Sequence, residues 1–132
     1  MAAIAKSGTP SISTPLVSPE QRLSGLLAGE AIAAGDACYI NSADNKLYRS
    51  TGAAATAPAQ VDGFAATSAA IGEALSIYFG VNFRYGAGLT PGTSLFLSGT
   101  TAGGLDTVAP TGGTVVIARI LDDSRIYVRK SY

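Results

Sequence analysis

The 132-residue sequence has no histidine and no tryptophan, and Cys38 is its only cysteine. A single cysteine excludes a disulfide within the chain. The absence of histidine excludes Ser-His-Asp and Cys-His catalytic groups and the usual His/Cys zinc sites. Cys38 lies in an apolar strand-like segment, so we expect a small buried side chain and not a nucleophile. We therefore expect no enzymatic activity, no metal site and no cofactor.

Charged residues are also few, and the nine basic and nine acidic residues leave a formal net charge of zero. Such a balance gives no overall attraction to nucleic acid or to an anionic membrane. The sequence has no apolar run close to the roughly 20 residues of a membrane span, and its first residues lack the apolar core of a signal peptide. We expect a protein that binds neither nucleic acid nor membrane and stays in the compartment where it is made.

Small residues are what the chain has in abundance, since Ala, Gly, Ser and Thr make up almost half of it. A chain of this length is long enough for one domain with a core. Small side chains bury little area each, however, and burial contributes only about 25 cal/mol per Å². We therefore expect the isolated chain to be modestly stable and to gain stability from partners that cover more of its surface.

The first 22 residues differ in composition from the rest, with half of the prolines of the chain. Proline fixes φ and favours extended backbone in the residue before it. Two interpretations are open, a disordered tail and an extended arm that orders on another chain, and the apolar residues of the segment favour the arm. We divide the chain into an N-terminal arm, 1–22, and a β-rich core, 23–132. The arm residues predicted to contact the partner are Ile4, Pro10, Ile12, Pro15, Leu16, Val17 and Pro19.

Short strand-like segments separated by turn residues fill the rest of the chain. Two pairs of them flank polar turns, NSADN and LDDS, that are typical of hairpins. The longest segment contains Gly80, which indicates a bulge or bend within one strand. The predicted strands are 37–40, 46–49, 61–65, 74–85, 93–98, 114–120 and 125–130.

The spacing of these strands predicts a mainly β fold. The expected architecture is a small β-barrel or β-sandwich of short antiparallel strands with the extended N-terminal arm. Helix is hard to place, because Pro58 and Gly72 interrupt the two alanine-rich segments, 53–59 and 65–74. We expect at most one short helical turn there.

Two groups of side chains are candidates for binding. The basic residues Arg119, Arg125, Arg129 and Lys130 outnumber Asp122 and Asp123 near the end of the chain. This excess is typical either of a solvated strand face or of a surface for a charged partner, while the two aspartates themselves are typical turn residues. The second group consists of tyrosines that would form an aromatic platform if exposed: Tyr39, Tyr48, Tyr78 and Tyr85.

Several segments, taken in order, resemble one known family. They are residues 33–48 (AAGDACYINSADNKLY), 61–65 (VDGFA), 75–85 (LSIYFGVNFRY), 88–98 (GLTPGTSLFLS), 102–106 (AGGLD) and 125–129 (RIYVR). Together they resemble the head decoration, or capsid cement, proteins of tailed bacteriophages, over about residues 25–130. Each segment alone has only the residues typical of turns and strands. The resemblance depends on the order and spacing of the six segments.

The resemblance implies a compact β domain, often trimeric, that binds the outside of an expanded icosahedral head and has no enzymatic activity. The implied partners are the major capsid protein and further copies of this chain. The implied location is the outer surface of the virion, after synthesis in the host cytoplasm. What the arm contacts stays open. The alternative from another class is a glycan- or host-surface-binding β module that would use the tyrosine platform; an enzyme is a more distant third.

Overall fold

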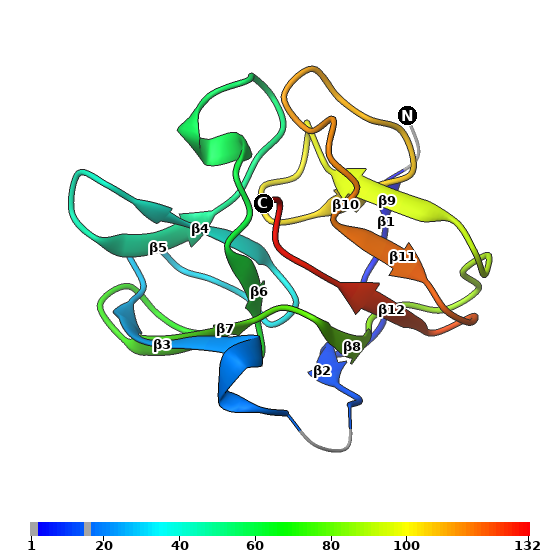
Figure 1. Cartoon of the computed structure of the whole chain (residues 1–132), viewed down its shortest axis with the longest axis horizontal. Coiled ribbons are helices and arrows are strands. Elements are labelled where there is room, and N and C mark those ends of the chain that lie inside the picture. The colour runs from blue at the N-terminus through cyan, green and yellow to red at the C-terminus, as the bar shows by residue number, and fades with distance from the viewer. Residues whose placement is uncertain (1–2, 15–16) are drawn as a thin grey trace.

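The computed structural model describes residues 3–14 and 17–132, and it confirms a mainly β fold of two antiparallel sheets that lie side by side (Figure 1). The larger sheet has seven strands in the order β1-β10-β9-β11-β12-β8-β2. Because β1 and β2 stand at opposite ends of this order, the sheet is not a closed barrel. Its strands are β1 (Ala3–Ile4), β2 (Ser11–Ile12), β8 (Val81–Arg84), β9 (Ser94–Leu97), β10 (Leu105–Asp106), β11 (Ala118–Ile120) and β12 (Arg125–Val128).

The smaller sheet has five strands in the order β3-β7-β6-β4-β5. Two short 3-10 helices, η1 (Pro19–Gln21) and η2 (Ala57–Ala59), complete the regular structure of the described residues. Of these, η2 is the helical turn that the first alanine-rich segment allowed. The strands of the smaller sheet are β3 (Arg22–Leu27), β4 (Ala37–Asn41), β5 (Lys46–Arg49), β6 (Gly63–Ala65) and β7 (Ala74–Tyr78).

Both predicted hairpins are confirmed. In the β4–β5 hairpin Tyr39 lies opposite Tyr48, and the turn ends at Asn45, the one described residue other than glycine with a positive φ, 60°. Asparagine tolerates this left-handed conformation better than most residues do. In the β11–β12 hairpin the Asp122 side chain accepts hydrogen bonds from the backbone N–H groups of Ser124 and Arg125. Turn chemistry therefore fixes the register of both hairpins.

The long segment 74–85 is not one bent strand, as the sequence led us to expect. It forms β7 in the small sheet and β8 in the large sheet, with Phe79 and Gly80 between them. Gly80 has a φ of 68°, which glycine adopts without steric cost. The glycine is therefore the point at which the chain crosses from one sheet to the other.

The predicted strand 114–120 is also shorter than expected, because β11 extends only over Ala118–Ile120. Residues 114–116 follow Gly112 and Gly113, which pack closely against Ala54 and Leu97. The two loops 51–60 and 107–117 meet at these glycines. Strand β11 begins only after this contact, at Ala118, where it pairs with β9 and β12.

The side chains of the two sheets form two apolar clusters. The larger cluster lies on the inner face of the seven-stranded sheet and includes Phe83, Leu95 and Ile126, together with Phe64 from the small sheet. The smaller cluster lies on the other side of the small sheet and contains Cys38, Leu47 and other residues. Phe64 thus packs against the large-sheet cluster while belonging to the small sheet, and its ring centroid lies 6.3 Å from that of Phe83. Among the described residues, no helix is long and apolar enough to cross a membrane.

The turn before β4 touches the turn between β9 and β10. Gly103 has a φ of 76°, its N–H donates to Ser50 O, and its carbonyl accepts from Ala37 N. A Cβ built on Gly103 would lie 2.8 Å from Cγ of Asp36, too close for real atoms. By contrast, Gly72 has a φ of 86° and open space around it.

Replacing these two glycines by alanine should separate backbone strain from steric conflict. Gly72→Ala should lower the free energy of unfolding by about 1–2 kcal/mol, the cost of a left-handed residue with a Cβ. Gly103→Ala should cost about 1–3 kcal/mol more, because the new methyl group also displaces Asp36. Urea unfolding of both variants measures the difference. Equal losses would show that the contact between the two turns is loose.

Candidate interaction surface

The N-terminal segment lies along the larger sheet of its own chain. Ile4 in β1 pairs with Leu105 in β10, and Ile12 in β2 pairs with Phe83 in β8. The Ser7 N–H donates to Tyr85 O between these two short strands. A single extended stretch, residues 3–14, thus bridges the two edges of the seven-stranded sheet that would otherwise stay open (Figure 1).

The predicted contact residues are partly buried by this arrangement. The side chains of Ile4, Ile12 and Val17 pack against the large-sheet cluster, and Pro10 is buried. Pro15 and Leu16 lie outside the described residues, and Pro19 begins η1. The sequence led us to expect another chain as the surface for this segment. The structure shows the chain's own sheet, and contact with a partner stays a prediction.

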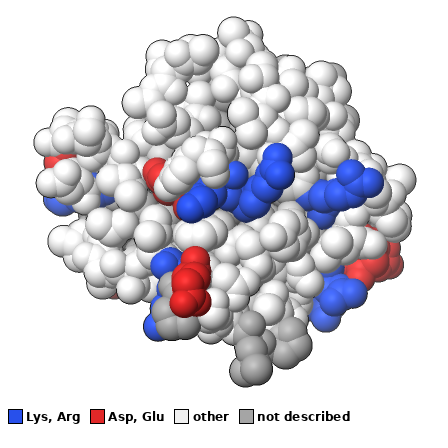
Figure 2. All heavy atoms as spheres, viewed as in Figure 1, with Lys and Arg blue, Asp and Glu red and all other residues white. Residues whose placement is uncertain are grey.

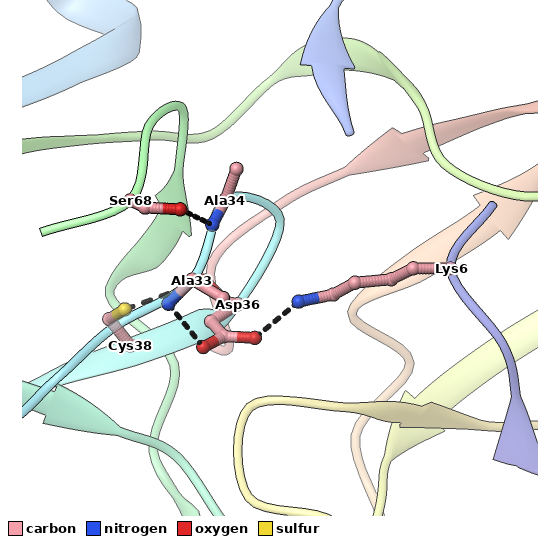
Figure 3. Close-up of polar contacts among 6 residues, drawn as sticks. All are labelled: Lys6, Ala33, Ala34, Asp36, Cys38 and Ser68. Carbon is pink, nitrogen blue, oxygen red and sulfur yellow. Dashed lines mark hydrogen bonds and ion pairs between the residues drawn. The ribbon is translucent and has the colours of Figure 1, made fainter. Parts of the chain in front are cut away.

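An ion pair holds the middle of the N-terminal segment to the small sheet (Figure 3). Nζ of Lys6 lies 2.5 Å from Oδ1 of Asp36, whose side chain is only 7% exposed. The other carboxylate oxygen, Oδ2, accepts a hydrogen bond of 2.9 Å from the backbone N–H of Ala33. A buried carboxylate needs such partners, because leaving one uncompensated is costly. Lys6 thus fastens residues 3–14 to the turn before β4.

A close steric fit accompanies this ion pair. Gly35, next to Asp36, has a φ of 84°, and a Cβ there would lie 2.8 Å from side-chain atoms of Pro10. The turn at residues 33–36 is itself held by the Ser68 hydroxyl, which accepts from Ala34 N at 3.3 Å (Figure 3). The ion pair, the proline and the glycine together fix where the N-terminal segment crosses from one sheet edge to the other.

The outer face of the larger sheet is rich in arginine. Alternation along β11 and β12 buries Ala118, Ile126 and Val128 and leaves Arg119 and Tyr127 exposed. These two exposed residues lie directly opposite each other on adjacent strands. Figure 2 shows basic side chains in a row across this face, below a large area without charged side chains. The basic excess near the end of the chain is therefore gathered on one face.

A shallow depression of about 380 Å³ lies beside this row. Its lining includes Val115, which is exposed, and the rings of Phe79 and Tyr132. Nζ of Lys130 lies 4.6 Å from the ring centroid of Phe79 and 4.9 Å from that of Tyr132. Both distances are within the range of cation–π attraction, which orients the ammonium group between the two rings.

The tyrosine platform of the alternative hypothesis is not formed as expected. Tyr85 is 1% exposed and Tyr39 is 8% exposed, so neither ring can stack on a ligand. The Tyr48 hydroxyl is occupied by a short hydrogen bond of 2.5 Å to Oδ2 of Asp44. The exposed tyrosines are instead Tyr127 and Tyr132, near the basic row. Sequence alternation around the buried Ile126 and Val128 was the signal that could have identified Tyr127.

Two further residues that could take part in chemistry are Cys38 and Asp122. Cys38 is buried, and its burial raises the pKa of the thiol. Hydrogen bonds from the Ser124 N–H and the Arg125 side chain lower the pKa of Asp122 to about 2. Asp122 therefore accepts the hydrogen bonds of the turn as a charged carboxylate. In the part of the chain that the structure describes, no group of three His, Cys, Asp or Glu side chains is placed to hold a metal ion.

No protein-family model matches the sequence, and no curated protein matches it.

The ion pair between Lys6 and Asp36 should contribute measurably to stability. Lys6→Met keeps most of the side-chain volume but leaves the buried carboxylate without its cation, so the free energy of unfolding should fall by about 1–3 kcal/mol. Lys46→Met is the matched control, because Lys46 forms no ion pair with any residue that the structure describes, and it should change stability by no more than about 0.5 kcal/mol. Urea unfolding measures both. Equal effects of the two substitutions would show that the pair does not hold the N-terminal segment.

Proposed function

We propose that this chain is a structural virion protein that binds the outer surface of a phage head. On this proposal it cements neighbouring copies of the major capsid protein and stabilises the expanded shell. The observation that carries the proposal is the ordered resemblance to head decoration proteins, together with where its segments lie in the fold. They form the β4–β5 hairpin, β6, the β7–β8 crossover, β9, β10 and β12.

Those segments belong to both sheets and to the connection between them. A resemblance restricted to one hairpin would be explained by common turn chemistry. Here it extends over the crossover at Gly80 and the turn at Asp36, two places where the fold imposes specific requirements on the residue. This distribution supports a relation of the whole domain and not of one local motif.

The N-terminal segment suggests how attachment would work. Its strands β1 and β2 are only two residues long, and Ile4 and Ile12 are only partly buried. Extended segments of this kind can add to an exposed strand edge of a partner with little demand on sequence. A protein that binds only the expanded shell would stabilise that state by linkage. Several copies acting together would add the effect of multivalency.

We further propose that the chain assembles as a trimer. A core made largely of small residues gives each copy modest stability, and contact between copies would bury more apolar surface. Light scattering of the purified protein should give three times the 13.3 kDa of one chain across the micromolar range. A mass of one chain over that whole range would exclude the trimer.

Attachment should depend on the N-terminal segment. Full-length protein should co-sediment with purified, expanded heads of the phage that encodes it, and a chain that lacks residues 1–22 should be displaced in direct competition. Because Ile4 and Ile12 also pack on the chain's own core, circular dichroism must first show that the truncated chain is folded.

A point variant avoids this difficulty. Lys6→Met should keep the sheet and release the middle of the segment, so its occupancy on heads should differ from that of Lys46→Met. Absence of full-length protein from the sedimented heads, with binding on a glycan array, would favour the glycan-binding alternative.

A further inference from the structure

Four of the six arginines of the chain project from one face of the larger sheet. On β8 and β12, buried residues alternate with more exposed ones, and Arg84 lies directly opposite Arg125. Arg119 lies opposite Tyr127, and Arg129 follows Tyr127 by two residues, so it continues the same side of the strand. The remaining arginines, Arg22 and Arg49, belong to the small sheet.

This arginine face has little internal compensation. The structure shows three ion pairs between described residues, namely Lys6–Asp36, Arg49–Glu30 and Arg125–Asp122. Arg84, Arg119 and Arg129 have no carboxylate partner among these pairs, and Nε of Arg129 donates to the carbonyl of Val116. Like charges on adjacent strands are unfavourable in the isolated chain. They become favourable when carboxylates of another molecule cover the face.

The end of the face near Lys130 offers a different contact. There the depression lined by Val115, Phe79 and Tyr132 presents apolar surface next to an ammonium group that two rings orient. A ligand that fits the whole surface has several carboxylates and an apolar side chain beside them. The forked guanidinium group of arginine matches carboxylates with two parallel hydrogen bonds.

We propose that the arginine face binds an acidic segment of a partner protein, with carboxylates on Arg119 and Arg129 and an apolar side chain in the depression beside Lys130. The inference rests on the proposed function, since it names the chemistry that the shell would present to this chain. A long polyphosphate fits less well, because Asp122 and Asp123 stand in the turn at the end of β11 and the net charge of the chain is zero. A short acidic segment can end before that turn.

The test uses the full chain and a fluorescein-labelled peptide of four glutamates, one leucine and four more glutamates. The double variant Arg119→Glu/Arg129→Glu should weaken binding about tenfold at low salt, because it replaces two attractions by two repulsions. The matched control is Arg22→Glu/Lys46→Glu, which makes the same change of charge away from the face and should weaken binding less than twofold. Fluorescence anisotropy gives the dissociation constants, and melting curves show that the variants are folded.

Should charge reversal on the sheet prevent folding, Arg119→Gln/Arg129→Gln should still weaken binding several-fold relative to Arg22→Gln/Lys46→Gln. Equal weakening by the face pair and the control pair would overturn the assignment of the face. Tighter binding of a single-stranded oligonucleotide or of heparin than of the peptide, lost in the same face variant, would overturn the choice of protein carboxylates.

Sedimentation with heads separates this inference from the proposed function. If the wild-type chain binds heads and Arg119→Glu/Arg129→Glu binds them equally well, the arginine face is not the contact and the proposed function stands. If the wild-type chain does not bind heads, the proposed function fails whatever the peptide does. Loss of head binding in the face variant alone supports both.

Discussion

The buried carboxylate of Asp36 is the interaction on which the arrangement of this molecule depends. One of its oxygens accepts the N–H of Ala33 and so shapes the turn before β4, while the other binds Lys6 from the N-terminal segment. Its side chain also fills the space beside Gly103, at the turn between β9 and β10. A charged group with so little exposure must keep its partners. The turn, the N-terminal segment and the second hairpin are consequently held at one point.

A second connection between the sheets lies at the other end of the chain. The Ser131 hydroxyl accepts from Val61 N, and the Tyr132 hydroxyl donates to Oδ1 of Asp62. Residues after β12 of the large sheet are thus bound to the segment before β6 of the small sheet. Together with the covalent crossover at Gly80, these bonds join two sheets that bury most of their apolar side chains in separate clusters.

Local chemistry predicted much of the fold and little of its long-range contacts. The hairpins around NSADN and LDDS followed from turn residues, and the mainly β class from strand spacing. The division of 74–85 between two sheets did not follow, because a glycine with positive φ is equally compatible with a bulge and with a crossover. The Lys6–Asp36 pair joins residues 30 positions apart, which no spacing rule connects. The basic residues were recognised as a local excess, but their common face with Arg84 required the pairing of β8 with β12.

The pairing of the N-terminal segment has a consequence for the order of events during synthesis. Ile4 pairs with Leu105 and Ile12 with Phe83, so the segment is made long before either of its partner strands exists. At the usual rates of about 5–20 residues per second, the ribosome needs roughly 5–20 seconds to reach β10. Until β8 has been made, residues 3–14 have no partner strand of their own chain to join, and until β10 has been made β1 still lacks its partner. Any neighbouring nascent or completed chain with an open sheet edge competes for them, and crowded polysomes would favour exchange of this segment between copies.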